Sequence, residues 1–222
     1  MLRGGKEKEM TQGKLIDITQ TLSYATPVIA GDAPLEIRLT SDTKKGECAN
    51  VSSLTLSPHL GTHMDAPLHL FDKGGDVLTI SLEACAGEAV VVDLSDADTL
   101  EPVTMAELGS LPQDVKRVLS KTRKSPLLSV DEPYRPISPE AVRALAQRGV
   151  VLLGTDTFGV DPLISTSLEG HHAALGAGMI LLENLLLKPV SAGRYELLAF
   201  PLKIAGLEAS PVRATVRKLS ST

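Results

Sequence analysis

The sequence predicts an α/β or α+β domain built around a mixed β-sheet. Two observations indicate this class: short apolar runs typical of strands predominate, and the clearest helix comes late in the chain, at residues 138–149. A clean alternation of strands and helices is not visible. The 222 residues suffice for one domain that buries roughly 70% or more of the surface of its unfolded chain. With no Trp, three Tyr and three Phe, its core must be mostly aliphatic.

The first half of the chain is predicted to contain strands. We expect residues 1–13 to be a disordered lead-in and residues 14–222 to form the single domain. Apolar runs predict strands over residues 14–22, 50–57 and 87–95, and another strand ends near residue 40 after a turn at residues 31–34.

The second half contains the predicted helices. Thr104 and Glu107 form a capping-box pattern, which predicts a short helix over residues 104–111. Ser138, Pro139 and Gly149 bound the helix at residues 138–149. Residues 115–121 are ambiguous, and strands are predicted at residues 125–130, 150–156, 195–204 and 210–219.

Charge and cysteine usage indicate a cytoplasmic protein that binds neither nucleic acid nor a membrane. The net charge is −5, and no basic stripe suggests a nucleic-acid surface. Cys48 and Cys85 form no CxxC pair, so we expect two free, mostly buried thiols in a reducing compartment. The N-terminal residues lack the apolar core of a signal peptide. The longest apolar run, residues 175–187, is too short to span a bilayer.

Three of the five histidines lie close together in the stretch SPHLGTHMDAPLHLF. His59, His63, Asp65 and His69 there form the pattern H-x-G-T-H-x-D-x-P-x-H. A straight strand would hold His59 and His63 about 13 Å apart at ~3.3 Å per residue, whereas one metal ion needs ligand atoms within ~2.0–2.2 Å of its centre. A tight bend at Gly61, which tolerates positive φ, would bring the two imidazoles together. Imidazole and carboxylate ligands suit zinc or manganese.

The other two histidines, His171 and His172, precede an apolar run that contains Glu183. In one straight helix His171 and Glu183 would lie about 18 Å apart at ~1.5 Å per residue. The glycines at 176 and 178 instead favour a short helix from about residue 171, a break, and an extended segment at residues 179–184 that folds back. A carboxylate in an apolar run needs solvent or a charge partner, and a metal ion would be one. Spacing favours His171 over His172 by only a small margin.

Together these motifs resemble the cyclase family of metal-dependent amidohydrolases, whose members include kynurenine formamidases and isatin hydrolases. The resemblance extends from residue 15 to nearly the end of the chain. It implies a swivelling β/β/α domain, with a mixed central sheet and helices packed on it, and assembly into homodimers or homotetramers. The segments that carry it are HLGTHMDAPLH (59–69), DTFGVDP (156–162), HHAALGAG (171–178) and ENL (183–185).

The same resemblance implies a centre of two divalent metal ions, with zinc as the first choice and manganese as the alternative. It implies that a small-molecule amide is the substrate. The roles that it implies for the candidate ligands are His59 and His63 on the first ion, His171 on the second, and Asp65 and Glu183 bridging both.

His69 lies beyond the implied ligands and would be the general acid/base, because an imidazole with a pKa of ~6.5 can take and give a proton near neutrality. The hypothesis is hydrolysis of a non-peptide C–N bond through a metal-bound hydroxide. The best candidate reaction is the conversion of N-formylkynurenine to kynurenine and formate. Bacterial kynurenine formamidases carry a tryptophan in the PVxxGD segment that packs on the aromatic substrate. In this chain Ile29 takes that place, and Ile29 is therefore the predicted substrate-binding residue.

Two alternatives to this reaction stay open. The chain could be a hydrolase of cyclic amides of the isatin type, or a non-catalytic binding protein that a metal ion stabilises. A ligand set without cysteine and with a spare histidine favours an open, catalytic site. Asp156 and Asp161 are candidates for orienting the ligands, although Asp161 and Pro162 could simply form a turn. His172, Asp17 and Asp32 have no assigned role.

Overall fold

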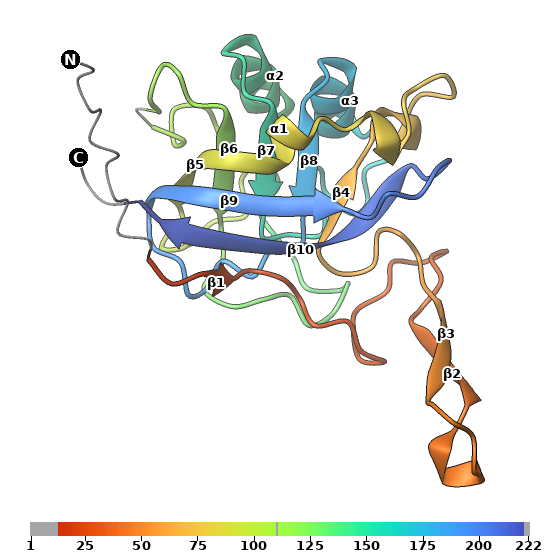
Figure 1. Ribbon diagram of the computed structural model, residues 1–222. Helices are drawn as coiled ribbons and strands as arrows, with labels where there is room; N and C mark the ends of the chain where they lie inside the picture. The colour runs from red at the N-terminus through yellow and green to blue at the C-terminus, as the bar shows by residue number, and fades with distance from the viewer. Residues whose placement is uncertain (1–12, 110, 220–222) are drawn as a thin grey trace, which may run out of the picture.

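The computed structural model describes residues 13–109 and 111–219 (Figure 1). All of the predicted lead-in except Gly13 lies outside the described residues. The strands are β1 (Ile16–Asp17), β2 (Glu36–Ser41), β3 (Val51–Thr55), β4 (His63–Asp65), β5 (Ala86–Asp93), β6 (Arg117–Lys121), β7 (Leu152–Thr155), β8 (Ile180–Glu183), β9 (Gly193–Pro201) and β10 (Ala209–Lys218). The helices are α1 (Leu82–Cys85), α2 (Pro139–Gln147) and α3 (Glu169–Gly176), with 3₁₀ turns at Thr43–Lys45, Pro67–His69 and Val77–Thr79.

All strands except β2 and β3 belong to one eight-stranded mixed sheet, in the order β1-β10-β4-β8-β7-β6-β5-β9. Strand β9 also pairs with β10, so the sheet closes on itself like a barrel and leaves β1 outside the ring. The consecutive pairs from β5 to β8 are parallel, and the remaining pairs of this sheet are antiparallel. The predicted α/β class with a mixed sheet is confirmed.

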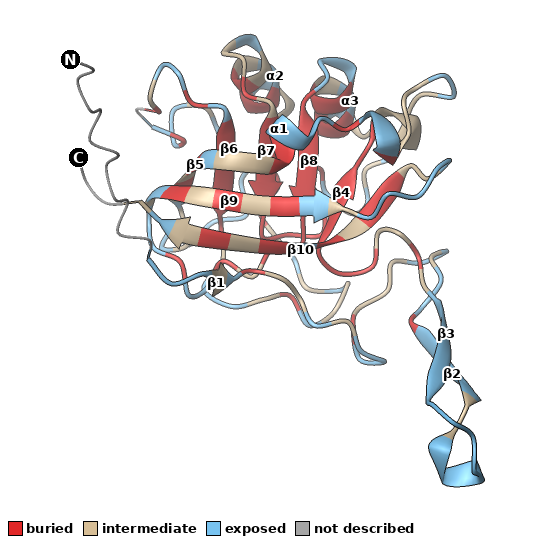
Figure 2. Cartoon of the chain, viewed as in Figure 1, coloured by how far each residue is buried: buried red, intermediate tan, exposed pale blue. Residues whose placement is uncertain are grey.

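Helices α2 and α3 lie together on one side of the parallel strands (Figure 1). The chain order β6-α2-β7-α3-β8 is a regular alternation that the sequence did not reveal. Leu153 of β7 packs in the apolar cluster beneath these helices, whereas its neighbour Leu152 packs in the cluster on the other face of the sheet. Leu181 and Leu182 of β8 divide in the same way. Strands buried on both faces have continuous apolar sequences, which hide the sheet periodicity. Figure 2 shows these strands as buried.

The predicted helix over residues 104–111 is wrong for the residues that the structure describes. The capping-box hydrogen bonds form: the Thr104 N–H donates to Glu107 Oε2 at 3.0 Å, and the Glu107 N–H donates to Thr104 Oγ1 at 3.4 Å. They close only a turn, because Gly109 adopts a left-handed conformation at φ +71° and Pro112 follows soon after.

The predicted strand over residues 125–130 is also wrong, whereas the ambiguous segment at 115–121 contains strand β6. Pro126 interrupts the first segment, and the N–H groups of Leu128 and Ser129 donate to the Glu132 carboxylate instead of to a neighbouring strand. Side-chain acceptors of this kind allow an apolar sequence to stay irregular.

Strands β2 and β3 form a separate hairpin that projects away from the body of the domain (Figures 1 and 2). Nearly every residue of both strands is exposed. Cys48 lies in the loop of this hairpin and is exposed, in contrast to the expected buried thiol, whereas Cys85 is buried. The exposed apolar side chains of the hairpin are Ile37, Leu39, Val51 and Leu54.

Among the described residues, no helix combines the length and apolar character that a bilayer crossing requires.

Candidate metal centre

Two neighbouring strands bring the two histidine-containing segments together. Strand β4 pairs antiparallel with β8, and His63 lies directly opposite Glu183. His63 and Asp65 are two residues apart on β4, so their side chains share one face of the sheet. His63 Nε2 lies 3.4 Å from Asp65 Oδ1 and 3.6 Å from Glu183 Oε2. Strand pairing therefore fixes the distance between these three side chains.

Gly61 forms the bend that separates His59 from His63. Its φ of +68° is left-handed, and a Cβ atom there would lie 2.5 Å from Leu22 Cδ2. His63 Nδ1–H donates a hydrogen bond to the Gly61 carbonyl oxygen at 2.8 Å. His63 Nε2 is then unprotonated, and its lone pair faces the carboxylates. His59 returns to the same place, with Nδ1 3.2 Å from Asp65 Oδ1.

His171 enters the centre from the first turn of α3. The chain leaves α3 through Gly178 at φ +74° and returns along β8, so Glu183 Oε1 lies 3.4 Å from His171 Nε2. Asp161 holds the other side of the ring, with Oδ2 2.7 Å from His171 Nδ1. The same carboxylate accepts hydrogen bonds from the backbone N–H groups of Gly170 and His171. Asp161 therefore orients His171, as ligand-supporting carboxylates do in metal sites.

His69 lies in the 3₁₀ turn after β4, beside the other imidazoles. Its ring centroid is 4.5 Å from that of His59 and 5.9 Å from that of His171. Burial lowers the pKa of His69, and the neighbouring imidazoles of His59 and His171 lower it further. Together these effects outweigh the charge of Asp65, which raises it. A neutral imidazole at neutral pH can accept a proton.

The two buried carboxylates favour positive charge on the imidazoles around them. Burial lowers the pKa of His171, but the charges of Glu183 and Asp65 and the contact with Asp161 outweigh it and raise that pKa well above its ordinary value. In the same way, Asp65 outweighs the effect of burial on His59 and raises the pKa of that imidazole. In this chain the centre therefore attracts cations.

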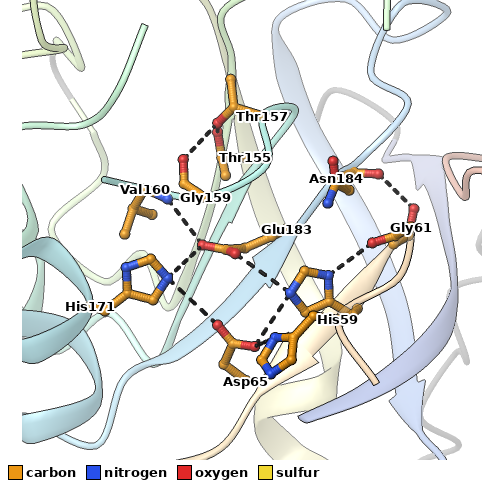
Figure 3. Close-up of polar contacts among 12 residues, drawn as sticks. His59, Gly61, Asp65, Thr155, Thr157, Gly159, Val160, His171, Glu183 and Asn184 are labelled. Atoms are coloured by element: carbon orange, nitrogen blue, oxygen red, sulfur yellow. Dashed lines mark hydrogen bonds and ion pairs between the residues drawn. The ribbon is translucent and has the colours of Figure 1, made fainter. Parts of the chain in front are cut away.

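Asp65 provides the test of whether a metal ion fits here. Its side chain is fully buried, and neither carboxylate oxygen has a hydrogen-bond partner among the described residues. A buried carboxylate without hydrogen bonds is costly, and a bound cation reduces that cost. The nitrogens of three imidazoles face these oxygens at 3.2–3.8 Å (Figure 3). Imidazole nitrogen and carboxylate oxygen are ligands typical of zinc and manganese, so these residues fit a divalent metal ion.

The ligand atoms form two overlapping groups. One group contains His59, Asp65 and His69, and the other contains His63, Asp65 and Glu183, with the atoms of each group within 4.8 Å of one another. Asp65 belongs to both groups. Because His69 belongs to the first group, geometry alone does not decide whether His69 binds a metal ion or carries a proton.

A cavity of about 220 Å³ opens next to the centre. Ile29 lines it, together with two aromatic side chains, Tyr134 and Phe158, whose ring centroids lie 6.1 Å apart. The Tyr134 hydroxyl donates to the Asp161 backbone carbonyl at 2.6 Å, which fixes that ring beside the cavity. The cavity thus has the candidate metal ligands on one side and partly apolar walls.

The remaining candidate residues lie in different places. His172 is exposed and stacks edge-on against Phe71, outside the centre. Asp156 accepts hydrogen bonds from the backbone N–H groups of Thr122 and Arg123, so it stabilises the loop after β6 and does not orient a ligand. Asp17 pairs with Arg213 at the surface, and Asp32 lines the cavity.

No sequence pattern pointed to Glu208, which also lies in this neighbourhood. Glu208 Oε1 lies 3.5 Å from His59 Nε2, on the side opposite Asp65. Glu208 precedes β10, which pairs with β4, and the Ala66 N–H donates to its backbone carbonyl. No local motif connects Glu208 with His59, so their proximity becomes visible only from the pairing of β10 with β4.

Comparisons with known proteins identify a family and relatives that this chain resembles. A family model described as "Putative cyclase" matches residues 16–162. A kynurenine formamidase from Salinibacter ruber is 43% identical over 209 residues, which cover 91% of this chain and 97% of that protein.

Solved structures share the fold over almost the whole chain. A potential metal-dependent hydrolase with cyclase activity has a TM-score of 0.79 at 28% identity, covering 94% of this chain and 99% of that one. Isatin hydrolase A from Ralstonia solanacearum has a TM-score of 0.78 at 25% identity, covering 92% of each chain. Isatin hydrolase A from Labrenzia aggregata has a TM-score of 0.76 at 27% identity, covering 93% of this chain and 94% of that one.

Proposed function

Because the chain belongs to the putative cyclase family, we propose that it is a metal-dependent amidohydrolase that converts N-formylkynurenine to kynurenine and formate. The observation that carries the proposal is the buried Asp65 carboxylate, which lacks a hydrogen-bond partner among the described residues and faces three imidazoles. The kynurenine formamidase relative, at 43% identity over most of both chains, supports the choice of substrate.

We propose that the centre holds two divalent ions, zinc in the first instance and manganese as the alternative. Two ligand groups that share Asp65 support the number, although these groups separate His59 from His63 and do not include His171. His59 and His63 would hold one ion, His171 the other, and Asp65 and Glu183 both. Divalent ions in such a centre lower the pKa of a water molecule and polarise an amide carbonyl.

The residues of the chain supply orientation and proton transfer. Asp161 and the Gly61 carbonyl each hold the Nδ1 side of one imidazole, so that the Nε2 atoms of His171 and His63 face the carboxylates. The Val160 N–H donates to Glu183 Oε1 at 3.0 Å and fixes that carboxylate. His69 would take a proton from the attacking water and then pass it to the departing amide nitrogen, because it lies beside the centre and burial lowers its pKa, which favours the neutral imidazole at rest.

The cavity walls support an aromatic substrate. No tryptophan is available in this chain, but Tyr134 and Phe158 offer aromatic surfaces, and Ile29 offers an apolar one. Aromatic rings make favourable offset or edge-on contacts with such side chains. The isatin hydrolases among the structural relatives support a cyclic amide as the second candidate substrate. The non-catalytic alternative has no support among the relatives described above, which are hydrolases.

A metal-loaded activity screen tests the proposal. The protein should release formate from N-formylkynurenine, and a chelator should abolish that release. Turnover of isatin without turnover of N-formylkynurenine would select the second candidate. Bound metal without hydrolysis of any formamide or cyclic amide would refute both.

We further propose that the chain forms a homodimer or homotetramer in the cytoplasm. The projecting β2–β3 hairpin supports the assembly, because an isolated two-stranded hairpin is marginally stable and this one exposes four large apolar side chains. The free cysteines are compatible with a reducing compartment. Replacing Leu39 and Leu54 together by Ser should reduce the molecular mass in light scattering. An unchanged mass would show that the hairpin is not the interface.

A further inference from the structure

Asp32 is a cavity residue that the proposed metal centre does not use. It lines the same cavity as the candidate ligands and is half-buried. Its side chain makes no hydrogen bond or ion pair with any residue in the described part of the chain. Its backbone N–H donates to the Ile29 carbonyl at 3.0 Å, in a turn that Gly31 permits at φ +99°. This turn places Ile29 and Asp32 together on one wall of the cavity.

The other carboxylates of the cavity are already engaged. Asp65 and Glu183 face the imidazoles of the centre, and Asp161 is bound to His171 and Gly170. The described residues that line the cavity include no Lys or Arg. Asp32 is therefore a carboxylate without a hydrogen-bond or ion-pair partner among the described residues, at a place that a substrate can reach.

We propose that Asp32 binds a cationic group of the substrate, so that the cavity selects aryl amides carrying an ammonium group over neutral ones. This inference rests on the proposed function and specifies the substrate class of the same site. The amino-acid end of N-formylkynurenine carries an ammonium group, whereas a cyclic amide of the isatin type carries none. A charge-assisted hydrogen bond in a half-buried cavity is stronger than an exposed ion pair, because water screens it less.

The expected kinetic signature follows from the role of Asp32 as a binding residue. The ammonium group is remote from the amide that reacts, so its contact with Asp32 is the same in the ground state and the transition state. Loss of such uniform binding raises KM and leaves kcat nearly the same.

The experiment compares two substrates on the metal-loaded protein and its Asp32→Asn variant. The first substrate is N-formylkynurenine. The second is 4-(2-formamidophenyl)-4-oxobutanoate, which keeps the aryl formamide and the carboxylate and lacks only the ammonium group. In Asp32→Asn, the ratio of kcat/KM for the first substrate to kcat/KM for the second should fall about tenfold or more, through KM of the first. Asp32→Glu, which keeps the charge, should retain most of the preference.

Two results would overturn the inference. An equal loss for both substrates in Asp32→Asn would mean that the residue shapes the turn and does not bind the cation. An unchanged ratio would mean that the ammonium group binds elsewhere. In both cases turnover by the unmodified protein would leave the proposed function standing. No turnover of either substrate by the unmodified protein would instead refute the proposed function, and the inference with it.

Discussion

His63 and Glu183, which are 120 positions apart in the sequence, lie directly opposite each other on β4 and β8, with His63 Nε2 3.6 Å from Glu183 Oε2. The pairing of two strands, and not a flexible loop, sets this distance. Side chains on rigid elements hold a binding geometry more closely than side chains on loops. The metal centre proposed here is therefore tied to the register of the sheet.

Glu183→Gln tests the contribution of this carboxylate to metal binding. The amide keeps the shape of the side chain and removes its charge, so we expect the affinity for the divalent ion to fall by more than about 100-fold. Loss of a residue that only hydrogen-bonds a ligand costs about 10–100-fold, so a larger loss indicates a direct ligand. Metal content after gel filtration and a chelator competition would measure it. Glu169→Gln, at an exposed position of α3, is the matched control and should retain full metal content. Full metal content in Glu183→Gln would exclude Glu183 as a ligand.

His69→Ala separates a proton carrier from a ligand. We expect kcat to fall by about 10²–10⁴-fold, as for the loss of a general acid/base, while metal content stays unchanged. The control is His172→Ala, because His172 is exposed and lies outside the centre. Loss of metal from His69→Ala would place His69 among the ligands, as its proximity to His59 and Asp65 permits.

Asp161→Asn tests the orientation of His171. The asparagine can still accept a hydrogen bond from His171 Nδ1–H, but it no longer supplies the negative charge that raises the basicity of the His171 ring. Metal affinity should fall by about 10–100-fold. Asp72→Asn, on the surface, is the control. An unchanged dissociation constant for the metal in Asp161→Asn would show that Asp161 serves only the turn before α3.

Metal binding should release protons and strengthen with pH. In the metal-free chain the carboxylates raise the pKa of His171 and His59, so these groups stabilise the metal-free fold below the ordinary pKa of histidine, ~6.5, and that contribution is lost as pH rises through the raised values. A metal ion must displace the same protons. The rise in Tm caused by metal should therefore be larger at pH 8.5 than at pH 6. Calorimetry in buffers of different ionisation enthalpy should detect the released protons, and equal gains in Tm at both pH values would contradict the prediction.

Gly61→Ala should disrupt the bend before β4. An alanine there adopts an unfavourable left-handed conformation, which costs about 1–2 kcal/mol, and its Cβ also meets Leu22 at 2.5 Å. Gly46→Ala is a matched control, because Gly46 has φ +86° and no atom within 4 Å of the added Cβ. Urea unfolding should show a larger loss of stability for Gly61→Ala, accompanied by weaker metal binding. Equal losses in both variants would mean that Leu22 moves aside without disturbing His59.

Local patterns succeeded where one segment contains the whole signal. The helix bounded by Ser138 and Gly149 is α2, and the Ser138 hydroxyl accepts the Ala141 N–H as a capping residue does. The left-handed bend at Gly61 was predictable because only a reversal lets His59 and His63 share one site. The fold-back after Gly178 was predictable for the same reason.

Local patterns failed where the partner of a residue lies far along the chain. Thr104 and Glu107 form their capping box, yet the carboxylate is also bound by Arg135 and the segment stays a turn. Residues 115–121 gave no clear periodicity because β6 is buried on both faces. The contact of Glu208 with His59 leaves no trace in spacing, whereas Asp161 was already a candidate for orienting a ligand and does contact His171.

The sequence by itself determined the chemical character of the site: imidazoles and carboxylates at a spacing that needs a bend, in a chain whose histidines are confined to two segments. The tertiary structure decided which of them meet. The closed sheet aligns β4 with β8, seals Asp65 from water, and leaves Asp32 on the cavity wall. Residue type fixes which ligands are available, whereas strand register and burial fix their distances and charges, and these depend on contacts between segments that no local pattern encodes.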